Sequence, residues 1–288
     1  MIDLLYLNGN KVSENKQISL KNPSFLYGIN CFEGIRGYYS KKEDKIKIVD
    51  LSSHLDRLIR SIQLLEFNVT LDKVKLIKEI NQIIINEDVK ENIYLRLTYF
   101  LDGEASWKEK EKISYTLNIR SMFSYLGQSW PVSLGISSYK RISKDTLPPH
   151  VKAGANYLNS RYSLLDSQKR GFQGTLMLNK QGFISESSGS CIFFIKDNEL
   201  FTPSEESDIL IGITRGSIIR IAKNNNIRVN EANILLEEIL HFDFAFLAGT
   251  MIEIKPISNI EKHFFQKENA TYDFIVNEYL KYTLHGGV

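Results

Sequence analysis

Cysteine is scarce in this chain, because Cys31 and Cys191 are the only two among 288 residues. Two cysteines cannot form a disulfide framework, so we expect a reducing compartment, the cytoplasm. No apolar run approaches the roughly 20 residues that a membrane-spanning helix needs. The opening residues, MIDLLYLNGN, have neither the cationic region nor the long apolar region of a secretory signal. We therefore expect no membrane span and no signal peptide.

An excess of one charge is also missing, since 36 basic residues face 34 acidic ones and the formal net charge is +2. That balance provides no basic surface for nucleic acid and no strong attraction to anionic lipid. No glycine-rich run ends in Lys-Ser or Lys-Thr, no Gly-x-Gly-x-x-Gly follows a strand, and the five histidines are scattered. The usual signatures of P-loop, dinucleotide and metal sites are thus absent, and we expect no metal.

The residue pattern that is present predicts a strand-rich α/β chain in two unequal parts. We expect a smaller N-terminal domain at 1–120, an interdomain loop at 121–130 and a larger C-terminal domain at 131–288. In the smaller domain, helices are predicted to begin at Ser52 or Ser53 and near Val74. The strands predicted there cover 31–39, 46–49, 93–101 and 115–119, after a strand from Leu4 that enters an Asn8-Gly9 turn.

The larger domain is predicted to contain an extended loop at 146–150, because Pro148 and Pro149 have no backbone N–H to donate. A helix is expected over 156–170, ended by Gly171. The remaining elements predicted there are strands at 132–137, 175–178, 183–185, 191–195, 200–201 and 244–248 and a helix at 214–222.

Four segments carry groups suited to chemistry. Lys152 precedes small residues at a predicted helix start, where an apolar setting favours the neutral, nucleophilic amine that forms Schiff bases. Gly212 and Thr214 lie at a helix start and Thr250 follows a buried strand, and free N–H groups at such positions bind anions. Glu186 lies among small residues and is able to pair with a cation. Taken singly, the four also fit a surface lysine, a capped helix, a simple turn and a solvated glutamate.

In combination and in this order, these segments resemble the class IV pyridoxal-phosphate aminotransferases, the fold-type-IV enzymes, over about residues 27–257. The resemblance is closest to the branched-chain amino acid aminotransferases, because Phe32-Glu-Gly-Ile-Arg36 is typical of that group. The other motifs that carry it are Tyr27-Gly-x-x-x-Phe32, His54-x-x-Arg57-Leu, Tyr94-Leu-Arg96, Lys152-Ala-Gly-x-Asn-Tyr157, Glu186, Gly212-Ile-Thr-Arg215 and Gly249-Thr250.

The resemblance implies an α/β fold of the α+β type, with a smaller N-terminal sheet domain, a larger strand-rich C-terminal domain and the cofactor pyridoxal 5′-phosphate (PLP) between them. Lys152 would be the catalytic residue, which bonds to the PLP aldehyde and later shuttles a proton. Glu186 would pair with the pyridine nitrogen, and Tyr157 would hydrogen-bond the phenolate oxygen. The phosphate would be held by Arg57, Gly212, Ile213, Thr214 and Thr250.

Substrate binding would fall, by the same resemblance, to Tyr27, Phe32, Arg36, Tyr94, Arg96, Tyr125, Thr250 and Met251. Tyr94 and the Thr250–Met251 turn would take the α-carboxylate, and Arg96 the distal carboxylate of glutamate. An aromatic wall with one reachable cation admits both leucine-like and glutamate side chains. In the family a loop from a second subunit closes the site. The segment 102–108, with Trp107, matches that loop, so a homodimer is implied.

Three positions depart from the family pattern: Cys191 where asparagine is usual, Leu97 where proline is usual, and Met251 where a small residue is usual. The expected reaction exchanges the amino group between a branched-chain L-amino acid and 2-oxoglutarate. Two alternatives stay open. One is a D-amino acid aminotransferase, an amine aminotransferase or an aminodeoxychorismate lyase on the same fold, and the other is a cofactor-binding protein without activity.

Overall fold

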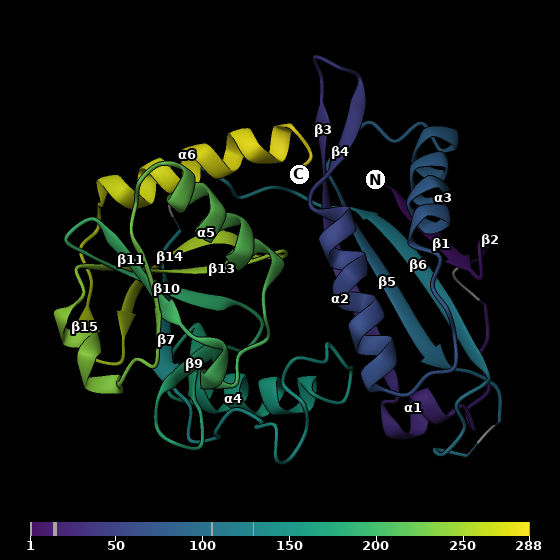
Figure 1. Ribbon diagram of the computed structural model, residues 1–288, viewed down its shortest axis with the longest axis horizontal. Helices are drawn as coiled ribbons and strands as arrows, with labels where there is room; N and C mark the ends of the chain where they lie inside the picture. The colour runs from purple at the N-terminus through teal and green to yellow at the C-terminus, as the bar shows by residue number, and fades with distance from the viewer. Residues whose placement is uncertain (1, 14–15, 105, 129, 288) are drawn as a thin grey trace. The chain divides into compact units, whose positions relative to one another are not determined.

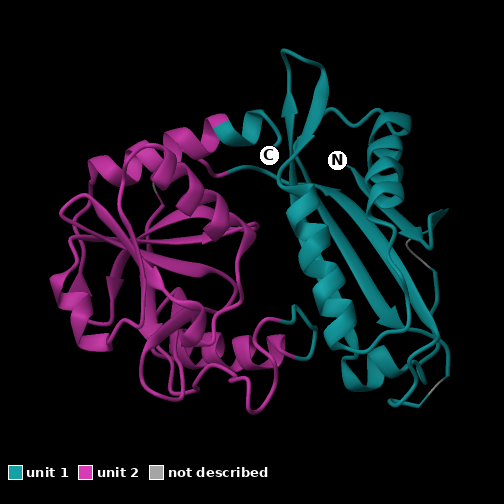
Figure 2. Cartoon of the chain, viewed as in Figure 1, with its two compact units in different colours: residues 1–124, 151–155, 282–288 teal, residues 125–150, 156–281 magenta. Residues whose placement is uncertain are grey.

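The computed structural model describes residues 2–13, 16–104, 106–128 and 130–287, which form a mixed α+β structure (Figure 1). The chain divides into two compact units (Figure 2). Residues 1–124, 151–155 and 282–288 make up the first unit, and residues 125–150 and 156–281 make up the second. The first unit thus includes the short segment that carries Lys152, although this segment lies far along the chain.

The first unit is built on an antiparallel sheet in the order β2-β1-β6-β5-β3-β4. Its tight turns follow the sequence: Asn8 and Gly9 have φ of 49° and 80°, as a two-residue type I′ turn requires. The strands expected from Leu4, at 31–39, at 46–49, at 93–101 and at 115–119 are all confirmed. The elements are β1 (Asp3–Leu7), β2 (Asn10–Val12), α1 (Pro23–Tyr27), β3 (Asn30–Ser40), β4 (Lys45–Ile48), α2 (Leu51–Leu64), α3 (Lys73–Asn86), β5 (Ile93–Leu101) and β6 (Ile113–Ser121).

One face of this sheet is covered by α2 and α3. Leu55 and Leu58 of α2 and Ile80 of α3 are buried in one cluster with Ile35 of β3 and Leu95 of β5. Apolar residues three or four positions apart put one stripe of each helix against the sheet. The paired strands β3 and β5 therefore have one core face and one opposite face.

The start of α2 differs from the prediction. The helix begins at Leu51 with Asp50 as N-cap, so a cap at Ser52 or Ser53 is wrong. Asp50 has a left-handed backbone, with φ of 52°, which turns the chain into the helix directly after β4. Its carboxylate accepts a hydrogen bond from the Tyr282 hydroxyl.

The second unit contains a mixed sheet in the order β12-β11-β10-β13-β14-β7-β8-β9, with β15 paired to β14. Every helix and strand predicted for this part is present, and Gly171 has the positive φ of 89° expected after a helix end. The loop expected to be extended at 146–150 instead begins with a turn, in which the Thr146 and Leu147 N–H groups donate to the Ser143 carbonyl. The elements are β7 (Val132–Ile136), α4 (Tyr157–Lys169), β8 (Gly174–Leu178), β9 (Ile184–Ser187), β10 (Cys191–Lys196), β11 (Glu199–Pro203), α5 (Ile213–Asn224), β12 (Val229–Ala232), β13 (Phe244–Gly249), β14 (Glu253–Ile260), β15 (His263–Phe264) and α6 (Ala270–Leu284).

The sequence did not lead us to predict β2, α1, α6, β12, β14 or β15. The start of α6 carries a local signal, since the Asn269 side chain accepts a hydrogen bond from the Tyr272 N–H, as an N-cap does. Phe194 and Leu247, on neighbouring strands, lie in the apolar core of the second unit. None of the helices in the described ranges is long and apolar enough to cross a bilayer.

Candidate active site

The backbone around Lys152 is held against β3, the strand that contains Phe32, by hydrogen bonds. The Phe32 N–H donates to the Lys152 carbonyl over 3.0 Å, and the Gly154 N–H donates to the Asn30 carbonyl over 3.0 Å. Between them, Ala153 forms an antiparallel bridge with Cys31. The Lys152 N–H also donates to the Ser61 hydroxyl of α2, over 3.3 Å. The residues before α4 thus act as a short extra strand beside β3.

The side chain of Lys152 approaches an aromatic ring. Its Nζ lies 5.0 Å from the centroid of the Phe32 ring, and the guanidinium of Arg96 lies 3.6 Å from the same centroid. Cations are attracted to the face of such a ring. The structure therefore brings together three residues that the sequence analysis assigned to catalysis and substrate binding.

The side chains of β3 alternate between the two faces of the sheet. Phe32, Gly34 and Arg36 lie opposite the core face, and their partners on β5 include Arg96 and Tyr94. A Cβ atom at Gly34 would lie 2.1 Å from the Tyr94 hydroxyl oxygen, so the tyrosine ring occupies the space that glycine leaves open. Arg36 is buried and donates to the Phe123 carbonyl over 3.0 Å, which fixes the chain just after β6.

On the core face, Glu33 forms a charged cluster with α2. Arg57 donates from Nε and Nη2 to the two Glu33 carboxylate oxygens, both over 2.7 Å, and His54 Nδ1 lies 2.7 Å from Oε2. Burial would raise the pKa of Glu33, but Arg57 and His54 outweigh it and lower this pKa to about 2. Burial in turn lowers the pKa of His54. Because Glu33 is ionised and only accepts, the neutral His54 must donate from Nδ1.

This cluster changes the expectation for Arg57. The sequence analysis assigned Arg57 to the cofactor phosphate, and the structure shows that Glu33 uses the Nε–Nη2 edge of its guanidinium. A further anion would have to contact the other edge of the guanidinium, formed by Nη1 and the second N–H of Nη2. The motif Phe32-Glu-Gly-Ile-Arg36 therefore contains a residue, Glu33, whose partner the sequence analysis did not identify.

Tyr27 lies at the end of α1 with half of its side chain exposed, and its ring centroid is 5.8 Å from that of Trp107. Trp107 belongs to the segment 102–108 that was expected to serve a second subunit, and Ala105 of that segment lies outside the described residues. Asp102, at its start, accepts hydrogen bonds from Asn22 and Ser114. One end of the segment is thus anchored in the first unit.

In the second unit, α5 presents an N-terminus with the features of an anion site. Gly212 is its N-cap, and among the described residues no side chain caps this end. The N–H groups of Ile213 and Thr214 belong to the first turn, which has no partners within the helix. A Cβ at Gly212 would lie 2.7 Å from the sulfur of Cys191, the residue that replaces the family's usual asparagine. With cysteine at 191, position 212 therefore requires glycine.

Glu186, on β9, is buried and held by two donors. Arg141 Nη2 lies 2.8 Å from Oε1, and the Leu210 N–H donates to Oε2 over 3.2 Å. Arg141 is also buried, and the sequence analysis missed it, since its only signal is a positive charge in a loop before the lysine motif.

The remaining predicted residues of the second unit lie at strand and helix ends. Tyr157 is the first residue of α4, and Thr250 and Met251 form the turn between β13 and β14. The backbone N–H of Tyr125 donates over 2.7 Å to the carboxylate of Glu253, which is buried at the start of β14. The strand β14 begins directly after that turn. Glu253 thus links Tyr125 to the strand that follows Met251.

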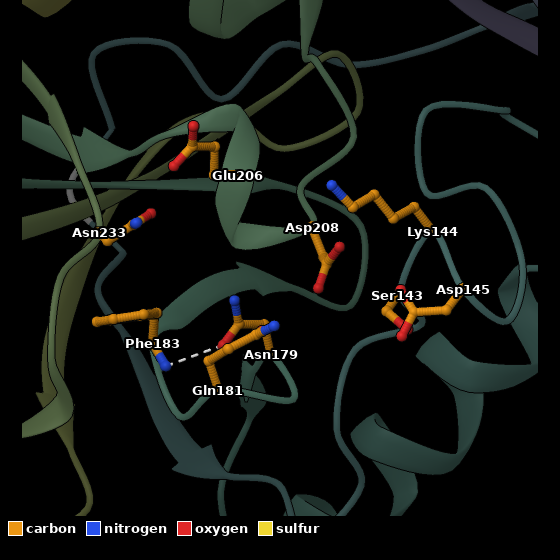
Figure 3. A pocket seen from close by; sticks show the side chains of 9 residues that line it. All are labelled: Ser143, Lys144, Asp145, Asn179, Gln181, Phe183, Glu206, Asp208 and Asn233. Carbon is orange, nitrogen blue, oxygen red and sulfur yellow. Dashed lines mark hydrogen bonds between the residues drawn. The ribbon is translucent and has the colours of Figure 1, made fainter.

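A polar cavity of about 290 Å³ lies in the second unit and contains none of the predicted site residues (Figure 3). The Asn179 Oδ1 accepts the Phe183 N–H, and its buried Nδ2 has no hydrogen-bond partner in the described part of the chain. Burial raises the pKa of Asp208 on the same wall. Ordered water ordinarily satisfies such a donor. In the described ranges, no group of three or more His, Cys, Asp or Glu residues is placed to hold a metal ion.

Comparison with known proteins identifies the family of the chain. The model of the amino-transferase class IV family matches residues 30–260. A probable branched-chain-amino-acid aminotransferase of Aquifex aeolicus is 31% identical over 267 residues, which cover 90% of this chain and 85% of that protein.

Solved structures of similar proteins share the fold. The branched-chain aminotransferase of Thermoproteus uzoniensis with norvaline has a TM-score of 0.91 at 30% identity, covering 98% of this chain and 94% of that one. The branched-chain amino acid aminotransferase of Thermobaculum terrenum in its PLP form has a TM-score of 0.91 at 27% identity, with the same coverage. The chain belongs to the class IV aminotransferase family, the fold-type-IV enzymes that its motifs resemble.

Proposed function

We propose that this protein is a PLP-dependent aminotransferase that exchanges the amino group between branched-chain L-amino acids and 2-oxoglutarate. The observation that carries the proposal is the placement of Lys152, whose backbone is bonded to β3 and whose amine lies beside the Phe32 ring. The similar proteins of Aquifex, Thermoproteus and Thermobaculum bear the name of this activity, which supports the choice of substrate.

The residues present have the chemistry that PLP requires. The cofactor carries an aldehyde, a protonated ring nitrogen and a phosphate dianion, and the chain offers an amine at Lys152, a buried carboxylate at Glu186 and the N-terminus of α5. Lys152 belongs to the first unit, and the other two belong to the second. We propose that all three serve one PLP molecule.

The chain would bind and orient the cofactor through groups with complementary charge. Glu186 would accept a hydrogen bond from the ring nitrogen and keep it protonated, and Tyr157 would donate to the phenolate oxygen. The N–H groups of Ile213 and Thr214, the Thr250 hydroxyl and Arg57 would hold the phosphate. When bound, PLP supplies the aldehyde that takes the amino group and a ring that withdraws electrons from the substrate Cα.

Lys152 would perform the proton transfer. Its amine would take the proton from the substrate Cα and return it to the carbon of the cofactor that carries the amino group. A flexible lysine fixed at its backbone suits this role, because the amine is able to move while the main chain stays on β3.

The opposite face of β3 and β5 would bind the substrate. Tyr94 and the Thr250–Met251 turn would take the α-carboxylate, and the aromatic rings of Phe32, Tyr27 and Tyr125 would contact an apolar side chain. Arg96 would bind the distal carboxylate of glutamate, while its guanidinium plane stacks on the Phe32 ring. We propose that Arg36 contributes by fixing the chain after β6.

We further propose a cytoplasmic homodimer. Cys31 and Cys191 are both buried and are thiols rather than the two halves of a disulfide, which is the usual state in a reducing compartment. Trp107 and Tyr27 are largely exposed aromatic residues in contact with each other. Aromatic residues of this kind are enriched in protein interfaces, which supports a role of the segment 102–108 at a second subunit.

An amino-donor panel tests the proposed function. Purified protein with PLP should transfer the amino group of L-leucine, L-isoleucine and L-valine to 2-oxoglutarate. Lys152→Ala should abolish this turnover and the borohydride-trappable bond between protein and cofactor. Normal transamination by Lys152→Ala, activity on D-alanine but not on L-leucine, or PLP binding without any half-reaction would each overturn the proposal.

A further inference from the structure

Arg141 lies at the centre of a buried hydrogen-bond network in the second unit. Its own N–H donates to the Leu178 carbonyl over 2.9 Å, which fixes its backbone at the end of β8. Its guanidinium contacts Glu186 Oε1 at 2.8 Å and donates from Nε to the Asp208 carbonyl over 3.4 Å. One side chain thus joins the carboxylate on β9 to the turn that precedes α5.

The same turn is held from two further sides. The Leu210 N–H donates to Glu186 Oε2 over 3.2 Å, and the Leu210 carbonyl accepts from the Cys191 thiol over 3.7 Å. Leu210 lies two residues before Gly212, the N-cap of α5. The position of the helix N-terminus therefore depends on Glu186, and the position of Glu186 depends on Arg141.

We propose that Arg141 is a positioning residue for the cofactor: it orients Glu186 and ties it to the segment that presents the N-terminus of α5. The contact to the ring nitrogen and the contact to the phosphate are then set by one rigid network. This inference rests on the proposed function, because it assigns a role toward bound PLP.

The chemistry of the pair explains why arginine is needed. Glu186 and Arg141 have only 6% and 7% of their surface exposed, and a buried carboxylate with no cation nearby favours its protonated form. A protonated Glu186 could not match the charge of a pyridinium nitrogen. The planar guanidinium binds a carboxylate and a carbonyl at once, whereas a lysine ammonium is a point charge without that geometry.

Variants at Arg141 test the inference. Arg141→Gln removes the charge, and Arg141→Lys keeps the charge but loses the planar fork. The matched control is Arg170→Gln, since Arg170 also bonds one carboxylate, Glu261, and one backbone carbonyl, that of Ile136, in the same unit but without touching Glu186. Unfolding of the apoproteins shows whether each variant is folded, and Arg141→Lys carries the test if Arg141→Gln is not.

The readouts are the dissociation constant of PLP and the pH dependence of its visible absorption band on the protein. We expect Arg141→Gln to weaken PLP binding by about tenfold or more, as removal of the outer partner of a metal-ligating side chain weakens metal binding. It should also shift the pH dependence of the band, which a loss of packing alone would not do. Arg141→Lys should weaken PLP binding but change the pH dependence of the absorption band less than Arg141→Gln does. Arg170→Gln should change neither the PLP affinity nor this pH dependence.

A double-variant cycle identifies the residue through which Arg141 acts. In a chain that already carries Glu186→Gln, adding Arg141→Gln should change PLP affinity clearly less than it does in the wild type, because both changes disrupt the contact between Arg141 and Glu186. Full additivity, or Arg141 variants that match Arg170→Gln, would overturn the inference. A wild-type protein that neither binds PLP nor transaminates would instead refute the proposed function, so the two failures are distinct.

Discussion

Replacing Glu33 with glutamine should destabilise the first unit strongly. Glu33 is fully buried, and Arg57 donates two hydrogen bonds to its carboxylate. Glu33→Gln therefore leaves a buried guanidinium without its counter-charge. Breaking a buried ion pair on one side costs about 3–5 kcal/mol. The pKa of Glu33, lowered from 4.5 to about 2, gives a similar figure, since that difference corresponds to about 3 kcal/mol of stability at neutral pH.

The pH dependence follows from the direction of the pKa change. A carboxylate whose pKa is lower in the folded protein stabilises it above the unfolded pKa of 4.5, and this contribution is lost as the pH falls toward about 2. The difference in free energy of unfolding between the wild type and Glu33→Gln should therefore be largest at neutral pH. It should decrease as the pH falls from 4.5 toward about 2.

Urea unfolding of the apoproteins at pH 7 and pH 3 measures this effect. The matched control is Glu43→Gln, because Glu43 also pairs with two cations, Lys45 and Lys47, but on the exposed turn between β3 and β4. The control should not change the unfolding midpoint. A loss of less than about 1 kcal/mol for Glu33→Gln, the value of an exposed pair, would refute this prediction. The same loss at both pH values would also refute it.

Three smaller predictions concern close contacts around the site. Gly34→Ala should raise KM for the amino donor by about tenfold or more with PLP affinity unchanged, because its methyl group would displace the Tyr94 ring and small misplacements of binding groups are costly; an unchanged KM would contradict this. Gly212→Ala should weaken PLP binding in a direct titration. Adding Cys191→Ala should restore part of the affinity, since it removes the sulfur that the new methyl group would contact; an affinity that is not restored would refute this contact. Burial raises the pKa of Cys31 to about 12, so a thiol reagent at pH 8 should modify it only after unfolding, and rapid labelling of the native protein would argue against its burial.

The sequence predicted the elements whose signals are local. Asn8-Gly9 after a short strand predicts a tight turn, and Gly171 predicts the end of the helix before it. The cap of α2 was wrong for a physical reason, because serine preference at an N-cap is local, whereas Asp50 adopts its left-handed backbone where β4 ends and is held by Tyr282, far along the chain. Helix α6 was missed although Asn269 caps it.

The sequence motifs single out candidate site residues one by one, but they do not reveal how these residues pair. The motif around Lys152 identified the lysine, and the register of β3 explains what the motif could not: the lysine is placed by its own backbone, through Phe32 and Asn30. For Arg57 the motif indicated the cofactor phosphate as partner, and the structure shows that the Glu33 carboxylate is also a partner. A pairing across 24 positions has no periodicity that a sequence reveals, since it depends on how α2 packs against β3.

Both buried carboxylates of the motifs are held by an arginine, Glu33 by Arg57 and Glu186 by Arg141. In each unit the charge of a buried carboxylate is thus compensated by the chain itself, before any ligand is present. A buried carboxylate without such a partner would be neutral or would destabilise the fold. A cofactor that arrives therefore meets groups that are already charged and oriented, so little of its binding energy is used to arrange them. This preorganisation is also why substitution of Arg141 should act on PLP affinity even though Arg141 is assigned no direct contact with the cofactor.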